Sequence, residues 1–237
     1  INKIDAKAKN KLDSISIPWE EKNHSYNNLK ESDLIIKSPG ISNESEIVIK
    51  LRNSKVKIIS EIEFASLHTN SFIIGITGSN GKTTTSKLIY HILKKSGLNV
   101  GIAGNIGTSF SRQIAENSFE YYVLEISSFQ LEDIIDFKPN IAIITNIFED
   151  HLDRYNYDFS KYIDSKLRIT MNQKNTDTIL YNIDDKILKD AINKSDSKAT
   201  KMTFGINSSS FDGKNILIKN KKKTLMINIE ELSLKGR

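Results

Sequence analysis

The stretch that decides the fold runs from Ser71 to Thr83 and reads S-F-I-I-G-I-T-G-S-N-G-K-T. Its first half, through Thr77, is an apolar run with the length of a buried strand, and its second half is rich in glycine. The next residues, Thr84–Lys95, repeat apolar side chains at helical spacing and stop before Gly97, a residue type that commonly ends helices. A strand, a glycine-rich turn and a helix in this order predict a phosphate-binding loop.

The predicted loop offers a phosphate group several kinds of contact. Glycines let backbone N–H groups turn toward an anion, and the N-terminus of the helix adds partial positive charge. Lys82 can reach the β- and γ-phosphates of a nucleotide, and the hydroxyl of Thr83 can bind Mg²⁺. The loop is shorter than the strict G-x-x-x-x-G-K-[ST] pattern, because Ile76 stands where the first glycine is required. A tight turn with a solvent-exposed lysine is the alternative. The residues expected to bind the nucleotide are Gly78, Ser79, Asn80, Gly81, Lys82, Thr83 and Thr84.

Further strand-like runs follow this loop, with helical stretches between most of them. They lie at 100–103, 121–126, 141–145 and 178–182, with a shorter run at 202–204. Alternating strands and helices predict an α/β fold with a mostly parallel, doubly wound sheet.

The segments on either side of this core are shorter and less regular. Apolar runs at 33–36 and 56–59, followed by a helix at 61–68, amount to about half of a Rossmann-like unit. Residues 211–229 predict a small β-hairpin, in which the basic run 219–223 is interpreted as a solvated tip.

The composition excludes several classes of function. The chain has 237 residues, of which 38% are hydrophobic and 27% charged, a balance typical of a globular protein. It contains no cysteine, which excludes disulfides, zinc–thiolate sites, iron–sulfur clusters and cysteine nucleophiles. No apolar run reaches the roughly 18–20 residues of a membrane helix. The net charge of +5 comes from 29 lysines and 5 arginines spread along the chain, so we expect neither a nucleic acid nor a membrane as a partner.

Two further residues stand where chemistry is expected. Glu125 lies inside the apolar run 121–126, near the carboxyl end of a parallel strand, where open α/β sheets bind ligands. It is interpreted as a Mg²⁺ ligand beside the phosphate loop, with capping of the next turn as the alternative. His151 follows the run 141–145 and would bind a metal, orient a phosphate or remain a surface histidine.

Lys166 is the least expected residue of the sequence. On a helix covering roughly 160–172, it shares a face with Phe159, Ile163 and Thr170. The spacing alone favours a snorkelling lysine, whose ammonium reaches water. The alternative is carbamylation by CO₂, which would turn the side chain into an anion able to bind Mg²⁺.

A set of motifs in this chain resembles the Mur ligase family. They are TGSNGKTTT at 77–85, GNIG at 104–107, LEISSFQLE at 124–132, TNIFEDHLDRY at 145–155 and YIDSKLRI at 162–169. SPGI at 38–41 also resembles the end of the UDP-binding first domain of these enzymes. The Ser-Ser-Phe-Gln-Leu-Glu stretch is most similar to the members that add D-glutamate.

The resemblance implies an ATP-dependent amide ligase of cytoplasmic peptidoglycan precursor synthesis, acting as a monomer. Its small-molecule substrates would be UDP-N-acetylmuramoyl-L-alanine and D-glutamate, joined through an acyl phosphate. Lys82, His151 and Lys166 would be catalytic, and two Mg²⁺ ions would be bound by Thr83 with Glu125 and by His151 with carbamylated Lys166. The positions that resemble the substrate segment are Asn105, Ser127, Ser128 and Gln130.

The resemblance also implies a domain organisation. Residues 1–69 would form part of a UDP-binding Rossmann-like domain, and residues 70–237 the central ATP-binding domain. The chain is therefore expected to be an internal piece of a longer protein and to lack the amino-acid-binding third domain itself. Two alternatives stay open: another Mur-type ligase, adding L-alanine or a diamino acid, or a catalytically silent ATP-binding fragment. A GTPase or a motor ATPase is disfavoured, because no Asn-Lys-x-Asp follows the short loop.

Overall fold

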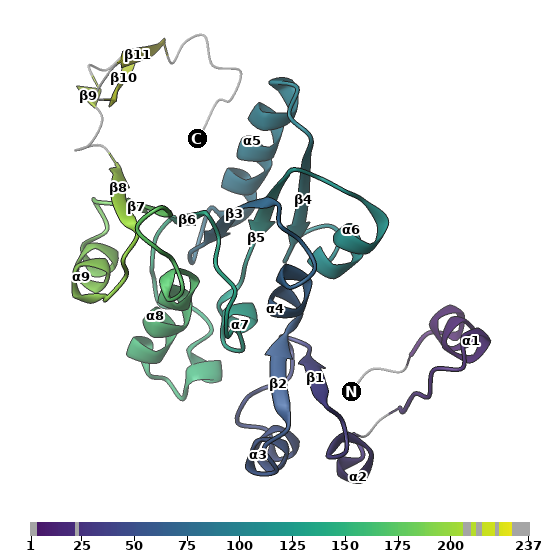
Figure 1. Ribbon diagram of the computed structural model, residues 1–237. Helices are drawn as coiled ribbons and strands as arrows, with labels where there is room; N and C mark the ends of the chain where they lie inside the picture. The colour runs from purple at the N-terminus through teal and green to yellow at the C-terminus, as the bar shows by residue number, and fades with distance from the viewer. Residues whose placement is uncertain (1–3, 22–23, 206–209, 212–214, 221–222, 229–237) are drawn as a thin grey trace. The chain divides into compact units, whose positions relative to one another are not determined.

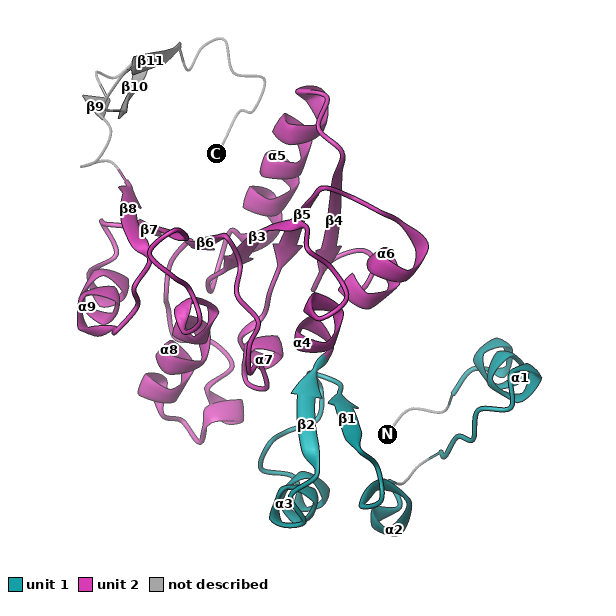
Figure 2. Cartoon of the chain, viewed as in Figure 1, with its two compact units in different colours: residues 1–60 teal, residues 61–237 magenta. Residues whose placement is uncertain are grey.

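The structure, a computed structural model, describes residues 4–21, 24–205, 210–211, 215–220 and 223–228 (Figure 1). The chain divides into two compact units, residues 1–60 and residues 61–237 (Figure 2). Helix α4 (Glu61–Ser66) belongs to the second unit, because its Ile62 and Ala65 are buried in that unit's core. The domain boundary expected at 69/70 stays a prediction.

The first unit is a small parallel β-α-β arrangement preceded by two helices. Strands β1 and β2 pair in parallel, with Leu34 opposite Lys57, and α3 connects them. These strands confirm the runs expected at 33–36 and 56–59, each displaced by one residue. The bounds are α1 Ala6–Ser14, α2 Tyr26–Leu29, β1 Leu34–Lys37, α3 Glu46–Asn53 and β2 Lys57–Ser60.

The second unit is built on a six-stranded sheet in the order β4-β5-β3-β6-β7-β8, with every neighbouring pair parallel. The expected doubly wound α/β fold is confirmed. The strand before the phosphate loop, β3, lies between β5 and β6, so the loop emerges where the strand order reverses, which is where open α/β sheets bind ligands. The strands are β3 Phe72–Thr77, β4 Val100–Gly104, β5 Tyr121–Glu125, β6 Ile141–Ile144, β7 Thr178–Asn182 and β8 Thr200–Phe204.

Two hydrophobic cores lie on the two faces of this sheet. On one face Ile74, Ile76 and Val123 pack with Ile89 and Leu93 of helix α5. On the other face the larger core takes residues from the remaining helices of the unit. Neighbouring residues along a strand, such as Ile73 and Ile74, belong to different cores because side chains alternate across a sheet. The helices are α5 Lys82–Lys95, α6 Phe110–Glu116, α7 Ser128–Leu131, α8 Phe159–Leu167 and α9 Lys186–Lys194.

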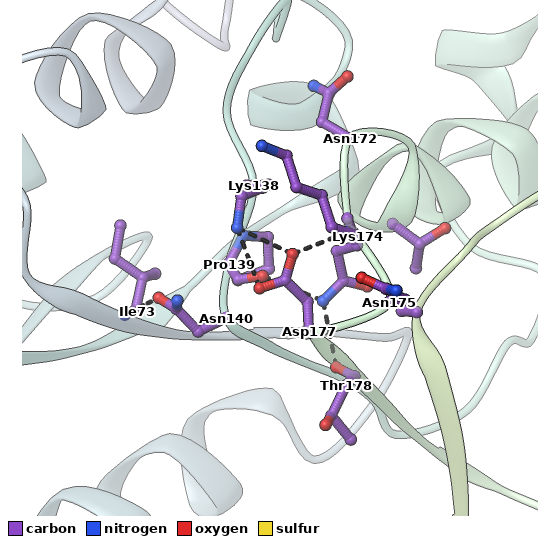
Figure 3. Close-up of polar contacts among 12 residues, drawn as sticks. Ile73, Lys138, Pro139, Asn140, Asn172, Lys174, Asn175, Asp177 and Thr178 are labelled. Atoms are coloured by element: carbon purple, nitrogen blue, oxygen red, sulfur yellow. Dashed lines mark hydrogen bonds and ion pairs between the residues drawn. The ribbon is translucent and has the colours of Figure 1, made fainter.

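Polar side chains bind the backbone at the amino ends of the strands (Figure 3). The buried carboxylate of Asp177 accepts hydrogen bonds from Lys138 Nζ at 2.8 and 3.0 Å and from the backbone N–H of Lys174 at 2.8 Å. The side chain of Asn140 accepts a hydrogen bond from the N–H of Ile73 at 2.8 Å. These contacts fix the starts of β3, β6 and β7 relative to one another.

A separate antiparallel sheet follows β8 in the chain. Strands β10 (Asn215–Asn220) and β11 (Lys223–Asn228) pair with Ile216 opposite Ile227, and β9 (Ser210–Phe211) pairs with β10. The expected hairpin is confirmed for its strands, whereas residues 221–222 of the expected basic tip lie outside the described residues. Among the described helices, none combines the length and apolar composition required to cross a membrane.

Candidate active site

The phosphate loop joins β3 to α5 and depends on glycine for its shape. Gly78 has a φ of +144°, and a Cβ atom there would overlap Oγ1 of Thr145. Gly81 has a φ of +81° and directly precedes α5. Helix α5 begins at Lys82, two residues before the expected start at Thr84, because the loop turns directly into the helix. The N–H groups of the first helical turn therefore face the loop, as an anion site requires.

The segment that follows β6 holds the phosphate loop through hydrogen bonds. The side chain of Asn146 accepts a hydrogen bond from the N–H of Asn80 at 2.9 Å and donates one to the Asn80 carbonyl at 3.1 Å. The Ser79 hydroxyl donates to the carbonyl of Phe148 and accepts from its N–H, both at 2.9 Å. It also lies 3.0 Å from the hydroxyl of Tyr162. The loop is thereby held in one shape by contacts within the protein.

Two lysines from different helices converge on the same loop. Lys82 Nζ donates to the carbonyls of Gly78 at 2.8 Å and Ser79 at 2.9 Å. Lys166 Nζ donates to the Gly78 carbonyl at 2.9 Å and lies 4.5 Å from the ring centroid of Tyr162. Their ammonium groups meet around one peptide group, so positive charge is concentrated where the loop would receive phosphate oxygens.

Lys166 is buried, which makes the snorkelling interpretation wrong. Its side chain is 2% exposed and points to the phosphate loop instead of to water. Burial, together with the positive charge of Lys82, lowers the pKa of Lys166 to about 7, and the negative charge of Asp150 opposes this shift. The helix is also shorter than the expected 160–172: α8 ends at Leu167, and a 3₁₀ turn covers Arg168–Thr170.

Glu125 connects two other motifs to the loop. It is the last residue of β5, is 2% exposed, and accepts a hydrogen bond from the Thr83 hydroxyl at 2.7 Å. Its second oxygen accepts from Asn105 Nδ2 at 2.9 Å. The alternative interpretation of Glu125 as a cap of the next turn is wrong, because Ser127 caps that helix.

The side chains of the Ser-Ser-Phe-Gln segment bind within the protein. Ser127 and Gln130 form a reciprocal capping box, with the Gln130 amide oxygen accepting from the Ser127 N–H at 3.0 Å. Ser128 is buried and hydrogen-bonds to Tyr155, whose pKa is raised to about 12 chiefly by burial. The expected substrate contacts of Asn105, Ser127, Ser128 and Gln130 stay predictions.

His151 differs from the other expected site residues because it is exposed. Its backbone is left-handed, with a φ of +51°, and its side chain is 58% exposed. Nε2 lies 3.5 Å from a carboxylate oxygen of Asp150, and the ring packs beside Phe129 with centroids 5.3 Å apart. Across the part of the chain that the structure describes, no three His, Asp or Glu side chains gather as a metal site. A metal shared by His151 and Lys166 stays a prediction.

A cavity of about 430 Å³ opens beside the phosphate loop. Polar groups of Asn80 and Asn146 lie at the loop, and Ile143, Leu180 and Phe204 supply apolar surface. The sequence pointed to the loop itself but not to Asn146 or Tyr162 as its supports. The available signal for Asn146 was its place directly after a buried strand that is adjacent to β3. The cavity is lined by Asn80, Gly81, Thr85, Ile89, Ile143, Thr145, Asn146, Leu180, Asn182 and Phe204.

Comparison with known families identifies this arrangement. Residues 76–236, from the end of β3 onward, match the family described as the Mur ligase middle domain. The chain belongs to the Mur ligase family. The resemblance expected from the motifs is therefore confirmed, and the phosphate loop, Glu125, His151 and Lys166 all lie within the matched residues.

The curated relatives show which Mur ligases this chain is similar to. The chain is 42% identical over 240 aligned residues to the UDP-N-acetylmuramoylalanine–D-glutamate ligase of Christiangramia forsetii, covering 99% of this chain and 54% of that protein. It is 49% identical to the enzyme of the same name from Bacteroides thetaiotaomicron, covering 83% of this chain and 44% of the relative. The chain thus spans about half the length of the curated relatives that it matches.

Solved structures of Mur ligases share the fold. The UDP-N-acetylmuramate:L-alanyl-γ-D-glutamyl-meso-diaminopimelate ligase of Neisseria meningitides aligns with a TM-score of 0.62 and 19% identity, covering 99% of this chain and 79% of that one. The MurF ligase of Thermotoga maritima, solved in complex with ADP, aligns with a TM-score of 0.53 and 19% identity, covering 86% and 56%.

Proposed function

We propose that this chain is the ATP-binding part of an ADP-forming ligase that joins D-glutamate to UDP-N-acetylmuramoyl-L-alanine. The observation that carries the proposal is the hydrogen-bonded series Thr83–Glu125–Asn105, which connects the phosphate loop to the segments LEISSFQLE at 124–132 and GNIG at 104–107. The names of the curated relatives supply the substrate and the amino acid.

The reaction proceeds in two steps. The carboxylate of the L-alanyl group attacks the γ-phosphorus of ATP, forming an acyl phosphate and releasing ADP. The amine of D-glutamate then attacks the acyl carbon, loses a proton and displaces inorganic phosphate, leaving an amide. The first step brings one anion against another, so the protein's main task is to neutralise charge and to orient the reacting groups.

Lys82 is suited to the first of these tasks. Its ammonium is already held across the loop by two carbonyl oxygens, at 2.8 and 2.9 Å, so phosphate oxygens would meet a positioned charge. The N–H groups at the start of α5 add their dipoles in the same direction. The cavity beside Asn80 and Asn146 has the mixed polar and apolar lining that a nucleoside requires.

The pair Thr83 and Glu125 fits a magnesium ion. Both offer oxygen atoms, the ligand type that Mg²⁺ prefers, and these atoms lie 2.7 Å apart at the phosphate loop. Bound there together with ATP, Mg²⁺ would neutralise charge on the β- and γ-phosphates.

Lys166 would join His151 at a second ion only as a carbamate, since an ammonium repels a cation. The Lys166 amine would add to CO₂ and lose a proton, which converts a cation into an anion. Burial and a pKa of about 7 support this step, because they leave a fraction of the amine neutral and nucleophilic. A Lys166→Ala variant is then expected to lose ligase activity and to recover part of it with added short carboxylic acids. Full activity of the variant would contradict the assignment.

The proposal extends to the rest of the chain. Residues 1–69 would be part of a UDP-binding domain, and Asn105, Ser127, Ser128 and Gln130 would contact or support the muramoyl-alanine substrate. The partners would be small molecules bound by a monomer in the cytoplasm, with no nucleic acid or membrane involved.

The test measures ADP release by the chain with Mg²⁺, ATP, UDP-N-acetylmuramoyl-L-alanine and D-glutamate, omitting each substrate in turn. Calorimetry with ADP and with the UDP substrate accompanies it. Release that requires both substrates, or binding of both ADP and the UDP substrate, supports the proposal. Failure to bind ADP contradicts the phosphate-loop assignment. Release with L-alanine or a diamino acid in place of D-glutamate contradicts the choice of amino acid.

A further inference from the structure

A buried carboxylate binds the backbone of one turn, at residues 135–137, which lies outside the phosphate loop. Glu63, on α4, is 2% exposed. Its two oxygens accept hydrogen bonds from three successive backbone N–H groups, those of Ile135 at 2.9 Å, Asp136 at 3.0 Å and Phe137 at 2.8 Å. Three N–H groups around one carboxylate form a compact anion site, here occupied by the protein's own side chain.

The carbonyl groups of the same turn are bound by side chains from another direction. Arg168 donates from Nε to the carbonyl of Leu131 and from NH2 to that of Ile134, both at 2.7 Å. Asn172 donates from Nδ2 to the carbonyls of Ile135 at 2.7 Å and Phe137 at 3.0 Å. We call residues 131–137 the clamped turn: three of its N–H groups are bound by a carboxylate and four of its carbonyls by side-chain donors.

The clamped turn is connected to two parts of the candidate site. It directly continues α7, which carries the Ser-Ser-Phe-Gln segment, and Arg168 stands two residues after Lys166. Directed hydrogen bonds from both sides leave the turn little freedom to shift. A displacement of about 1 Å at a substrate-binding segment is large enough to cost roughly a hundredfold in activity.

We propose that Glu63 and Arg168 are positioning residues, which set the place of the 127–131 segment relative to Lys166 and thereby the affinity for the UDP-linked substrate. This inference rests on the proposed function. Neither side chain is assigned a contact with substrate: Glu63 acts through the N–H groups of the clamped turn and Arg168 through its carbonyls. The ATP side of the site, at the phosphate loop, is held by other contacts and is expected to be independent of the clamp.

Calorimetry with ADP and with UDP-N-acetylmuramoyl-L-alanine tests this separation in the Glu63→Gln and Arg168→Lys variants. Glutamine offers one acceptor oxygen instead of two, and lysine cannot donate in two fixed directions. We expect each variant to bind the UDP substrate about tenfold more weakly and ADP within about twofold of the wild type.

Two variants serve as matched controls. Glu61→Gln changes a carboxylate on the same helix whose partner is the N–H of Ser111, outside the clamped turn. Arg112→Lys changes an arginine that pairs with Glu116 on α6. Both are expected to keep the affinities of the wild type for both ligands.

Hydrogen exchange gives a readout that does not depend on the substrate. In both clamp variants we expect amides in 127–138 to exchange about tenfold faster, with α5 unchanged. Variants that keep wild-type affinity for the UDP substrate, that lose ADP affinity equally, or that exchange faster only at 135–137 would overturn the inference. A wild-type chain that binds ADP but not the UDP substrate would instead overturn the proposed function, and with it the assigned role of the clamp.

Discussion

Charged side chains bind the protein at both ends of the six-stranded sheet, but their partners differ. At the amino end, the carboxylate of Asp177 is satisfied by Lys138 and by a backbone N–H, so its charge is neutralised within the fold (Figure 3). At the carboxyl end, Lys82 and Lys166 are held by carbonyl oxygens, which orient the ammonium groups without neutralising them. Removing one partner of a buried ion pair destabilises a fold, whereas a charge that is held only by carbonyl oxygens remains available to an anion.

The largest expected effect lies at the carboxyl end. Lys82→Ala removes the ammonium that faces the phosphate site, and we expect the affinity for ADP to fall about a thousandfold, or ~4 kcal/mol. The midpoint of thermal unfolding should stay close to that of the wild type, because Lys82 bonds only loop carbonyls. Lys87→Ala, on the exposed side of α5, is the control. If Lys82→Ala kept its affinity for ADP, the carboxyl end of the sheet would not differ from the amino end in binding an anion.

The corresponding change at the amino end should lower the free energy of unfolding and leave the affinity for ADP unchanged. Asp177→Ala leaves Lys138 and a backbone N–H without their acceptor, and we expect a loss of about 3 kcal/mol in the free energy of unfolding. Urea denaturation measures this loss, and calorimetry should find the ADP affinity of the folded variant unchanged. Asp190→Ala, on the exposed face of α9, should cost little. A variant with weaker ADP binding and normal stability would contradict this assignment.

The pH dependence of stability reports how strongly the fold disfavours the charged form of Lys166. Folding lowers the pKa of Lys166 from its usual 10.5 to about 7, so between these values the unfolded chain binds more protons than the folded one. The free energy of unfolding should therefore gain up to about 1.4 kcal/mol per pH unit from this group as the pH rises through that window.

Urea titrations at several pH values from neutral to alkaline test this slope. Lys166→Met should abolish the contribution, while Lys161→Met, on the exposed side of the same helix, should retain it. Equal slopes in the wild type and Lys166→Met would show that folding does not lower the pKa of Lys166.

The smallest expected effect on stability separates a neutral hydrogen bond from a charged one at the amino end of the sheet. Asn140→Ala removes the acceptor for the N–H of Ile73 but no charge, so we expect a loss of about 1 kcal/mol in the free energy of unfolding. Nucleotide affinity should not change. A loss as large as that of Asp177→Ala would indicate that backbone pairing, and not charge neutralisation, dominates at this end of the sheet.

Local patterns were enough to predict the elements that form the site. Each strand of the six-stranded sheet was visible as an apolar run, and the carboxyl end of β5 indicated that Glu125 would lie near the loop. The prediction failed for Lys166, where helical spacing favoured an exposed ammonium. Spacing along α8 specifies which residues share a face, but the depth of that face depends on what packs against it, here the phosphate loop and Tyr162.

The sequence by itself determined the order of strands and helices, the phosphate loop and membership of the Mur ligase family, because these depend on neighbours in the chain. The tertiary structure alone decided which partner each buried charge meets. Lys138 with Asp177, Glu63 with the clamped turn, and Lys166 with Gly78 each join residues far apart in sequence. Their orientation follows from the partners that folding brings within hydrogen-bond distance, which local periodicity does not encode.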